Sequence, residues 1–133
     1  MITADTNVLV RYTMHDDPIQ ADTAHRAIHS ADIVCIPTTA LCEYAWVLRS
    51  VYRLSRTDIA QALRTIIGAE NVRVNEVAVQ KGLAMLDLGG DFADGVIAVE
   101  GQWLGGEEFV TFDRQAADLL PAVGIRARYL DQG

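Results

Sequence analysis

Short apolar runs alternate with longer segments of helical period along most of this chain. The apolar runs are rich in β-branched residues and are bounded by polar residues, proline or glycine, which is the pattern of buried strands. We predict strands at residues 1–4, 33–36, 72–74, 109–112 and 125–129. Because strands and helices alternate, the pattern favours an α/β fold with a mostly parallel sheet.

Capping residues mark the expected helix boundaries. Asp17 precedes Pro18, which is the arrangement of an N-cap followed by proline at the first helical position. We expect Thr38 or Thr39 to cap the helix after the second strand, and Asp113 to cap the last helix. The predicted helices cover residues 7–15, 18–30, 38–53, 55–67, 75–88, 93–103 and 113–120.

Length and composition indicate one globular domain over residues 1–133, and half of the residues are hydrophobic, which excludes a disordered chain. No apolar run approaches the roughly 18 residues that a membrane-spanning helix needs. Asp5 comes too early in the chain for a signal peptide to precede it. Cys35 and Cys42 are too few for a disulfide framework. We therefore expect a cytoplasmic protein that makes no use of a membrane.

The charge balance is acidic, with 11 basic and 18 acidic residues giving a net charge of −7. A chain of this charge has no global basic field for the non-specific binding of nucleic acid. Any contact with nucleic acid must therefore be local or pass through a metal ion.

Four carboxylates lie at the ends of apolar segments or near helix N-termini, namely Asp5, Glu43, Asp94 and Asp113. In a parallel α/β fold, sites form beyond the carboxyl ends of the strands, so these side chains can meet at one edge. Converging carboxylates repel one another unless a cation lies between them, and Mg²⁺ or Mn²⁺ prefers such oxygen ligands. Taken singly, the four are ordinary caps or solvated acids, but taken together they favour a metal site.

Four segments occur in a recognisable order: Asp-Thr-Asn-Val-Leu at 5–9, Glu43 early in a helix, Asp-Phe-Ala-Asp at 91–94 and Thr-Phe-Asp-Arg at 111–114. Each is weak alone, but the ordered set resembles the PIN-domain ribonucleases, and most closely the toxin subunit of VapBC toxin–antitoxin pairs. The resemblance covers almost the whole chain. It implies a PIN-like three-layer α/β/α fold with a mostly parallel central sheet of four or five strands.

The same resemblance implies which residues carry the chemistry, with Mg²⁺ or Mn²⁺ as the cofactor. The family's metal-binding and catalytic acids fall on Asp5, Glu43, Asp94 and Asp113. Thr111 would be the small hydroxyl residue near the metal, and Thr6 and Asn7 would support the first turn.

The implied function is a metal-dependent endoribonuclease that hydrolyses RNA phosphodiester bonds as the toxin of a type II toxin–antitoxin pair. Its cognate antitoxin is expected to place a basic residue in the acidic pocket, since a guanidinium can bind two carboxylates. The alternative is a non-catalytic PIN-like binding module whose acids hold a structural metal ion.

Three further charged residues lie close in sequence to these acids. Asp91 stands three residues before Asp94, where we favour an N-cap, the alternative being an auxiliary ligand or a base that supports the site. Arg114 directly follows Asp113, and Arg114 and Arg11 are the candidates for holding RNA phosphates.

Two glycines depart from the family's pattern. Ala usually follows the third acid, whereas this chain has Gly95, and Gly101 interrupts the same helix further along. A glycine weakens a helix by roughly 1 kcal/mol relative to Ala. We therefore expect the mounting of Asp94 to be loosened.

The predicted helix at 38–53 carries more large apolar residues than one core face needs. These residues are Trp46, Val47, Leu48, Val51 and Tyr52. The excess indicates a homodimer, which the family resemblance also implies.

Overall fold

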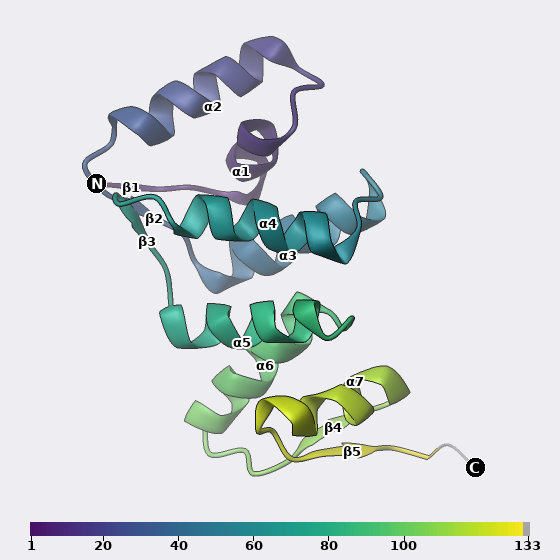
Figure 1. The fold of residues 1–133 in the computed structure, drawn as a ribbon. Helices are drawn as coiled ribbons and strands as arrows, with labels where there is room; N and C mark the ends of the chain where they lie inside the picture. The colour runs from purple at the N-terminus through teal and green to yellow at the C-terminus, as the bar shows by residue number, and fades with distance from the viewer. Residues whose placement is uncertain (132–133) are drawn as a thin grey trace. The chain divides into compact units, whose positions relative to one another are not determined.

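The computed structural model describes residues 1–131. It contains two compact units, Met1–Asn75 and a second that begins at Glu76 (Figure 1). The first unit consists of β1 (Ile2–Thr3), α1 (Thr6–Thr13), α2 (Pro18–Ser30), β2 (Val34–Cys35), α3 (Thr38–Ser50), α4 (Arg56–Ile67) and β3 (Val72–Arg73). The second consists of α5 (Glu76–Asp87), α6 (Phe92–Trp103), β4 (Phe109–Thr111), α7 (Arg114–Leu119), a short 3₁₀ helix (Leu120–Val123) and β5 (Ala127–Tyr129).

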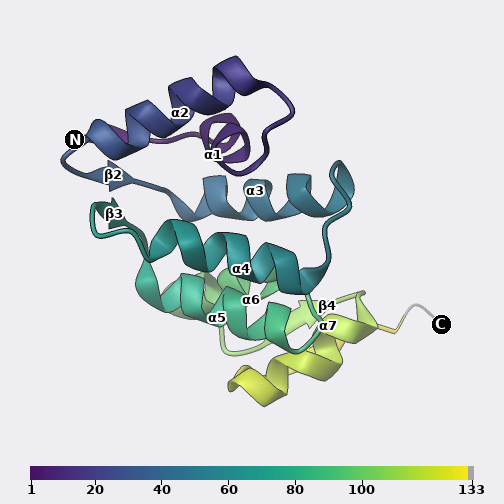
Figure 2. The same cartoon turned by 45° about the horizontal axis from the view of Figure 1, so that its top comes forward.

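The first unit is built on a parallel sheet in the order β1-β2-β3, with helices following the strands (Figure 2). Val34 is the central residue of this sheet, since it pairs with Ile2 on one side and Val72 on the other. Helix α1 contacts both α2 and α3, and α3 contacts α4. The largest fully buried side chains here are Leu9, Leu41, Tyr44, Leu48, Ile59 and Leu63.

In the second unit, β4 and β5 form a parallel pair in which Thr111 lies opposite Tyr129. Helices α5 and α6 pack closely against each other, and α7 packs beside the two strands. One hydrophobic cluster of this unit consists of Met85, Ala98, Ala116, Leu120 and Ile125. Parallel strands flanked by helices confirm the predicted α/β class, and all of the paired strands that the structure describes are parallel.

Most of the predicted helix starts are confirmed, but one cap is wrong. Asp17 caps α2, where its Oδ1 accepts from the amide of Gln20 at 3.0 Å. Thr38 and Thr39 do not cap α3, because Pro37 occupies the N-cap position with a φ of −63° and a ψ of 150°. The ring of a proline holds φ near this value, so the chain enters the helix without a side-chain cap.

None of the helices in residues 1–131 combines the length and the apolar character that crossing a bilayer requires.

Candidate metal centre

Three carboxylates meet in the second unit, at the start of α6 and the start of α7. Asp91 is the N-cap of α6, Asp94 lies in the first turn of that helix, and Asp113 is the N-cap of α7. One carboxylate oxygen from each lies within 4.8 Å of the others. We call these residues the acidic trio. Two of them, Asp94 and Asp113, belong to the four acids singled out in the sequence, and their predicted meeting is confirmed.

The third member, Asp91, occupies the N-cap position as favoured, but its side chain does not perform the usual capping role. Its backbone is extended, with a φ of −105° and a ψ of 138°, and its carboxylate makes no capping hydrogen bond within the described residues. The carboxylate lies with Asp94 and Asp113 instead. The position at the N-cap is confirmed, and a role of Asp91 in support of the site stays a prediction.

Asp113 is held in place from both sides. Its amide donates to Thr111 Oγ1 at 2.9 Å, and its Oδ1 accepts from the amides of Gln115 at 2.9 Å and Ala116 at 3.3 Å. Bonds from backbone amides at a helix N-terminus fix the orientation of the carboxylate that accepts them. The sequence Thr111-Phe112-Asp113 thus positions a carboxylate at the carboxyl end of β4.

Asp94 is the least favourable place for a negative charge in the acidic trio. Burial, and after it the neighbouring charges of Asp91 and Asp113, raise the pKa of this carboxyl to about 6. A cation at the trio would relieve both the repulsion and the loss of solvation. The burial and the mutual repulsion of these carboxylates therefore favour the binding of a cation.

A close crossing of α5 and α6 positions Asp94. A Cβ atom added at Gly95 would lie 2.5 Å from the carbonyl oxygen of Lys81 and 2.8 Å from the Cα of Gly82. A Cβ added at Gly82 would lie 2.6 Å from the ring of Phe92. The expectation that Gly95 loosens the mounting of Asp94 is wrong, because the missing side chain is what lets the two backbones touch.

Asp5 and Glu43 belong to the first unit. Asp5 is the N-cap of α1, where its Oδ1 accepts from the amide of Val8 at 3.1 Å. Thr6 is buried and Asn7 is exposed in the turn that follows. Glu43 is exposed on α3, in the second turn of that helix. The convergence of Asp5 and Glu43 with the acidic trio stays a prediction.

The two arginines predicted to hold phosphates have different surroundings. Arg11 forms an ion pair with Asp16 at 3.0 Å, and Tyr52 donates a hydrogen bond to the same carboxylate at 2.8 Å. The hydrogen bond from Tyr52, and then the charge of Arg11, hold the pKa of Asp16 below its ordinary value. Arg114 has its guanidinium carbon 4.1 Å from the centre of the Tyr129 ring.

Sequence reasoning missed Tyr129, which lies at the site only because β4 and β5 pair with Thr111 opposite Tyr129. A tyrosine at the end of the last predicted strand was the available signal, since parallel neighbours end at the same edge.

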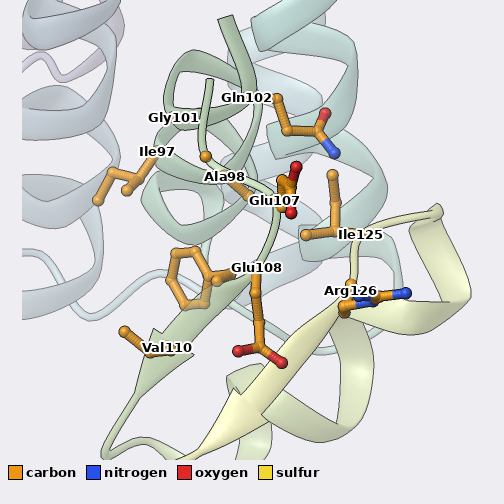
Figure 3. A pocket seen from close by; sticks show the side chains of 11 residues that line it. Ile97, Ala98, Gly101, Gln102, Glu107, Glu108, Val110, Ile125 and Arg126 are labelled. Carbon is orange, nitrogen blue, oxygen red and sulfur yellow. The ribbon is translucent and has the colours of Figure 1, made fainter. Parts of the chain in front are cut away.

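A separate cavity of about 210 Å³ lies between α6 and the β4–β5 pair (Figure 3). Ile97, Val110 and Ile125 line it together with the charged side chains of Glu108 and Arg126. None of the acidic trio lines this cavity, so it is a feature distinct from the candidate metal centre.

Three carboxylates with oxygens this close, one of them half-buried with a raised pKa, fit a hard divalent ion. Softer metals are a poorer match, because the trio offers oxygen ligands alone. Mg²⁺ and Mn²⁺ are therefore the ions that this donor set suits.

Comparison with models of known protein families identifies the family of this chain. The model of the PIN domain matches residues 2–119, and this chain belongs to the PIN-domain family. Proteins with this domain are commonly metal-dependent nucleases, which agrees with the acidic trio. A search of curated proteins found no match to this sequence.

Proposed function

We propose that this protein is a metal-dependent endoribonuclease that acts as the toxin of a type II toxin–antitoxin pair. The observation that carries the proposal is the meeting of Asp91, Asp94 and Asp113 within 4.8 Å in a chain of the PIN-domain family. Carboxylates this close repel one another, and a cation among them relieves that repulsion.

The acids that would hold Mg²⁺ or Mn²⁺ are Asp94 and Asp113, with Asp91 in support and Asp5 and Glu43 completing the set. A bound ion supplies a water of lowered pKa and offsets the charge that develops on the phosphate. The chain itself contributes the fixed orientation of Asp113, through its amide bonds, and the close crossing that mounts Asp94.

The remaining residues bind substrate or support the acids. Arg114 and Arg11 would contact RNA phosphates, because a guanidinium fork suits phosphate oxygens. Thr111 supports Asp113 through the hydrogen bond already described. Thr6 and Asn7 would hold the turn that presents Asp5.

The partners in this proposal are an RNA substrate, a cognate antitoxin and a second copy of the chain, in the cytoplasm and without a membrane. The antitoxin would cover an apolar face and insert a basic side chain among the acids. Residues 1–133 would form a single PIN-like domain, which the family match across both units supports.

The test is cleavage of single-stranded RNA with Mn²⁺ or Mg²⁺. We expect Asp94→Asn to lower kcat by at least about a hundredfold, because an amide cannot neutralise a cation. Removal of a group that stabilises charge in an active site typically lowers kcat by about this factor. Asp118→Asn is the matched control, since Asp118 is an exposed acid of the same unit outside the trio.

Two outcomes would contradict the proposal. Cleavage that is equally strong in Asp94→Asn would show that the trio is not the active centre. Mn²⁺ binding that is lost in Asp94→Asn, without RNA cleavage by the unmodified protein, would indicate the alternative of a binding module with a structural ion.

A further inference from the structure

An aromatic ring holds the arginine next to the acidic trio. The guanidinium carbon of Arg114 lies 4.1 Å above the centre of the Tyr129 ring, which is within the range of a cation–π interaction. Arg114 is the first residue of α7 and directly follows Asp113, whose carboxylate belongs to the trio. Tyr129 is therefore linked to the candidate metal centre through a single side chain.

The strand pairing fixes the position of this ring. Tyr129 lies opposite Thr111 in the parallel β4–β5 pair, and the amide of Leu130 donates to the carbonyl of Thr111 at 2.7 Å. Thr111 also accepts from the amide of Asp113 through its side chain. Tyr129, Thr111 and Asp113 thus share one rigid edge at the carboxyl ends of the two strands.

Stacking leaves the hydrogen-bonding edges of Arg114 available. A guanidinium that lies on an aromatic face keeps its N–H groups pointing outward in its own plane. Arg114 is exposed, and within the described residues of its unit it forms no ion pair. Nearby Arg128 differs, because its Nε is paired with Glu108 Oε1 at 3.0 Å.

We propose that Tyr129 is a positioning residue that holds the Arg114 guanidinium ready for a phosphate of single-stranded RNA next to the scissile bond. This inference rests on the proposed function. The ring restricts the rotamers of Arg114 before the substrate arrives, so less ordering is needed on binding. The effect should therefore be on substrate affinity, with the chemical step largely unaffected.

The first experiment compares steady-state cleavage of a mixed-sequence single-stranded RNA by variants of position 129. Tyr129→Phe keeps the aromatic face and should retain the KM of the unmodified protein. Tyr129→Leu keeps an apolar side chain of similar bulk but loses the face, and should raise KM by roughly three- to fivefold with kcat little changed. Arg128→Ala is the matched control for loss of a cation from the same strand, and should leave KM nearly unchanged because Glu108 already neutralises that charge.

A double-mutant cycle tests whether Tyr129 acts through Arg114. In an Arg114→Ala background, Tyr129→Leu should have no further effect on KM. Salt dependence separates the two roles: Arg114→Ala should reduce the slope of log affinity against log salt by about 0.7, the value for one phosphate contact on a single strand. Tyr129→Leu retains the charge and should weaken binding with little change in slope.

Nuclear magnetic resonance of the Arg114 Nε–H group gives a readout that does not depend on RNA. Its ring-current shift should persist in Tyr129→Phe and disappear in Tyr129→Leu. An equal effect of Tyr129→Leu with and without Arg114, or an unchanged KM in Tyr129→Leu despite loss of that shift, would overturn the positioning role while leaving the ribonuclease in place. Absence of both RNA binding and cleavage in the unmodified protein would instead overturn the proposed function, and the positioning role with it.

Discussion

Asp94 is the residue at which stability and function oppose each other. Its folded-state pKa is about 6, above the ordinary value of 3.8, because burial and then the charges of Asp91 and Asp113 disfavour ionisation. The folded protein therefore holds a proton that the unfolded chain releases between these two pH values. Without a metal ion, the contribution of Asp94 to stability is greatest below the unfolded pKa and is lost as the pH rises through the folded pKa.

This dependence of stability on pH leads to a prediction for Asp94→Asn. An asparagine has no charge to repel its neighbours, so in EDTA the variant should have a higher Tm than the unmodified protein near neutral pH. The difference should shrink as the pH is lowered to about 5, where the carboxyl of the unmodified protein is largely protonated. Thermal unfolding followed by circular dichroism at several pH values measures it.

Added Mn²⁺ should reverse the order of the two Tm values, so that the unmodified protein has the higher Tm. The reason is that the ion stabilises only a folded state that binds it. Asp118→Asn serves again as the control and should respond to pH and Mn²⁺ as the unmodified protein does. A Tm for Asp94→Asn that is lower than that of the unmodified protein in EDTA near neutral pH would show that Asp94 is not electrostatically strained.

At the scale of elements, the crossing of α5 and α6 distinguishes two glycines whose sequence positions carry the same expectation. Gly95 touches the backbone of α5, whereas a Cβ added at Gly101 would meet nothing within 4 Å. Both lie inside α6, so both carry the same intrinsic cost in helix propensity. Only the tertiary contact distinguishes them.

We predict opposite effects of the same substitution at these two positions. Gly101→Ala should stabilise the protein by up to about 1 kcal/mol, through the better helix propensity of Ala. Gly95→Ala should destabilise it by about 1–3 kcal/mol, because the added methyl group forces the two backbones apart. Urea denaturation measures both, and stabilisation by Gly95→Ala would show that the helices do not cross as closely as described.

The local elements could be predicted from the sequence, whereas the contacts that orient the site could not. Asp17 and Asp113 cap their helices as expected, since a cap depends on residues within one turn. Thr38 does not cap α3, because the preceding Pro37 occupies the N-cap position and its ring restricts φ there. The Gly95 contact and the stack of Arg114 on Tyr129 join segments that are distant in sequence, so their residues carry no local signal.

At the scale of the whole molecule, the apolar surface of α3 bears on association. Leu48 was counted toward a dimer surface, but it is 0% exposed and belongs to the core. Tyr52 is half-buried and donates its hydroxyl hydrogen bond to Asp16. Val47 is half-buried as well. Trp46 and Val51 are mostly exposed, at 63% and 62%, and a surface tryptophan is a common anchor of protein interfaces.

The predicted homodimer can be tested at Trp46. Trp46→Glu should give a monomer in light scattering at micromolar concentration, because a buried carboxylate at an interface is unfavourable without a partner. Ile19→Glu is the matched control, since Ile19 is 81% exposed on α2 and should leave the dimer intact. A monomeric unmodified protein would contradict the prediction directly.

The contact between Gly95 and Lys81 has a consequence for how this protein can diverge. Since main-chain atoms alone make that contact, no side chain is present at it that substitution could tune. In this chain the angle at which Asp94 is presented can be adjusted where a side chain meets the same crossing, as the Phe92 ring does at Gly82. An Ala at position 95, the residue usual in the family's pattern, would first require α5 and α6 to lie further apart.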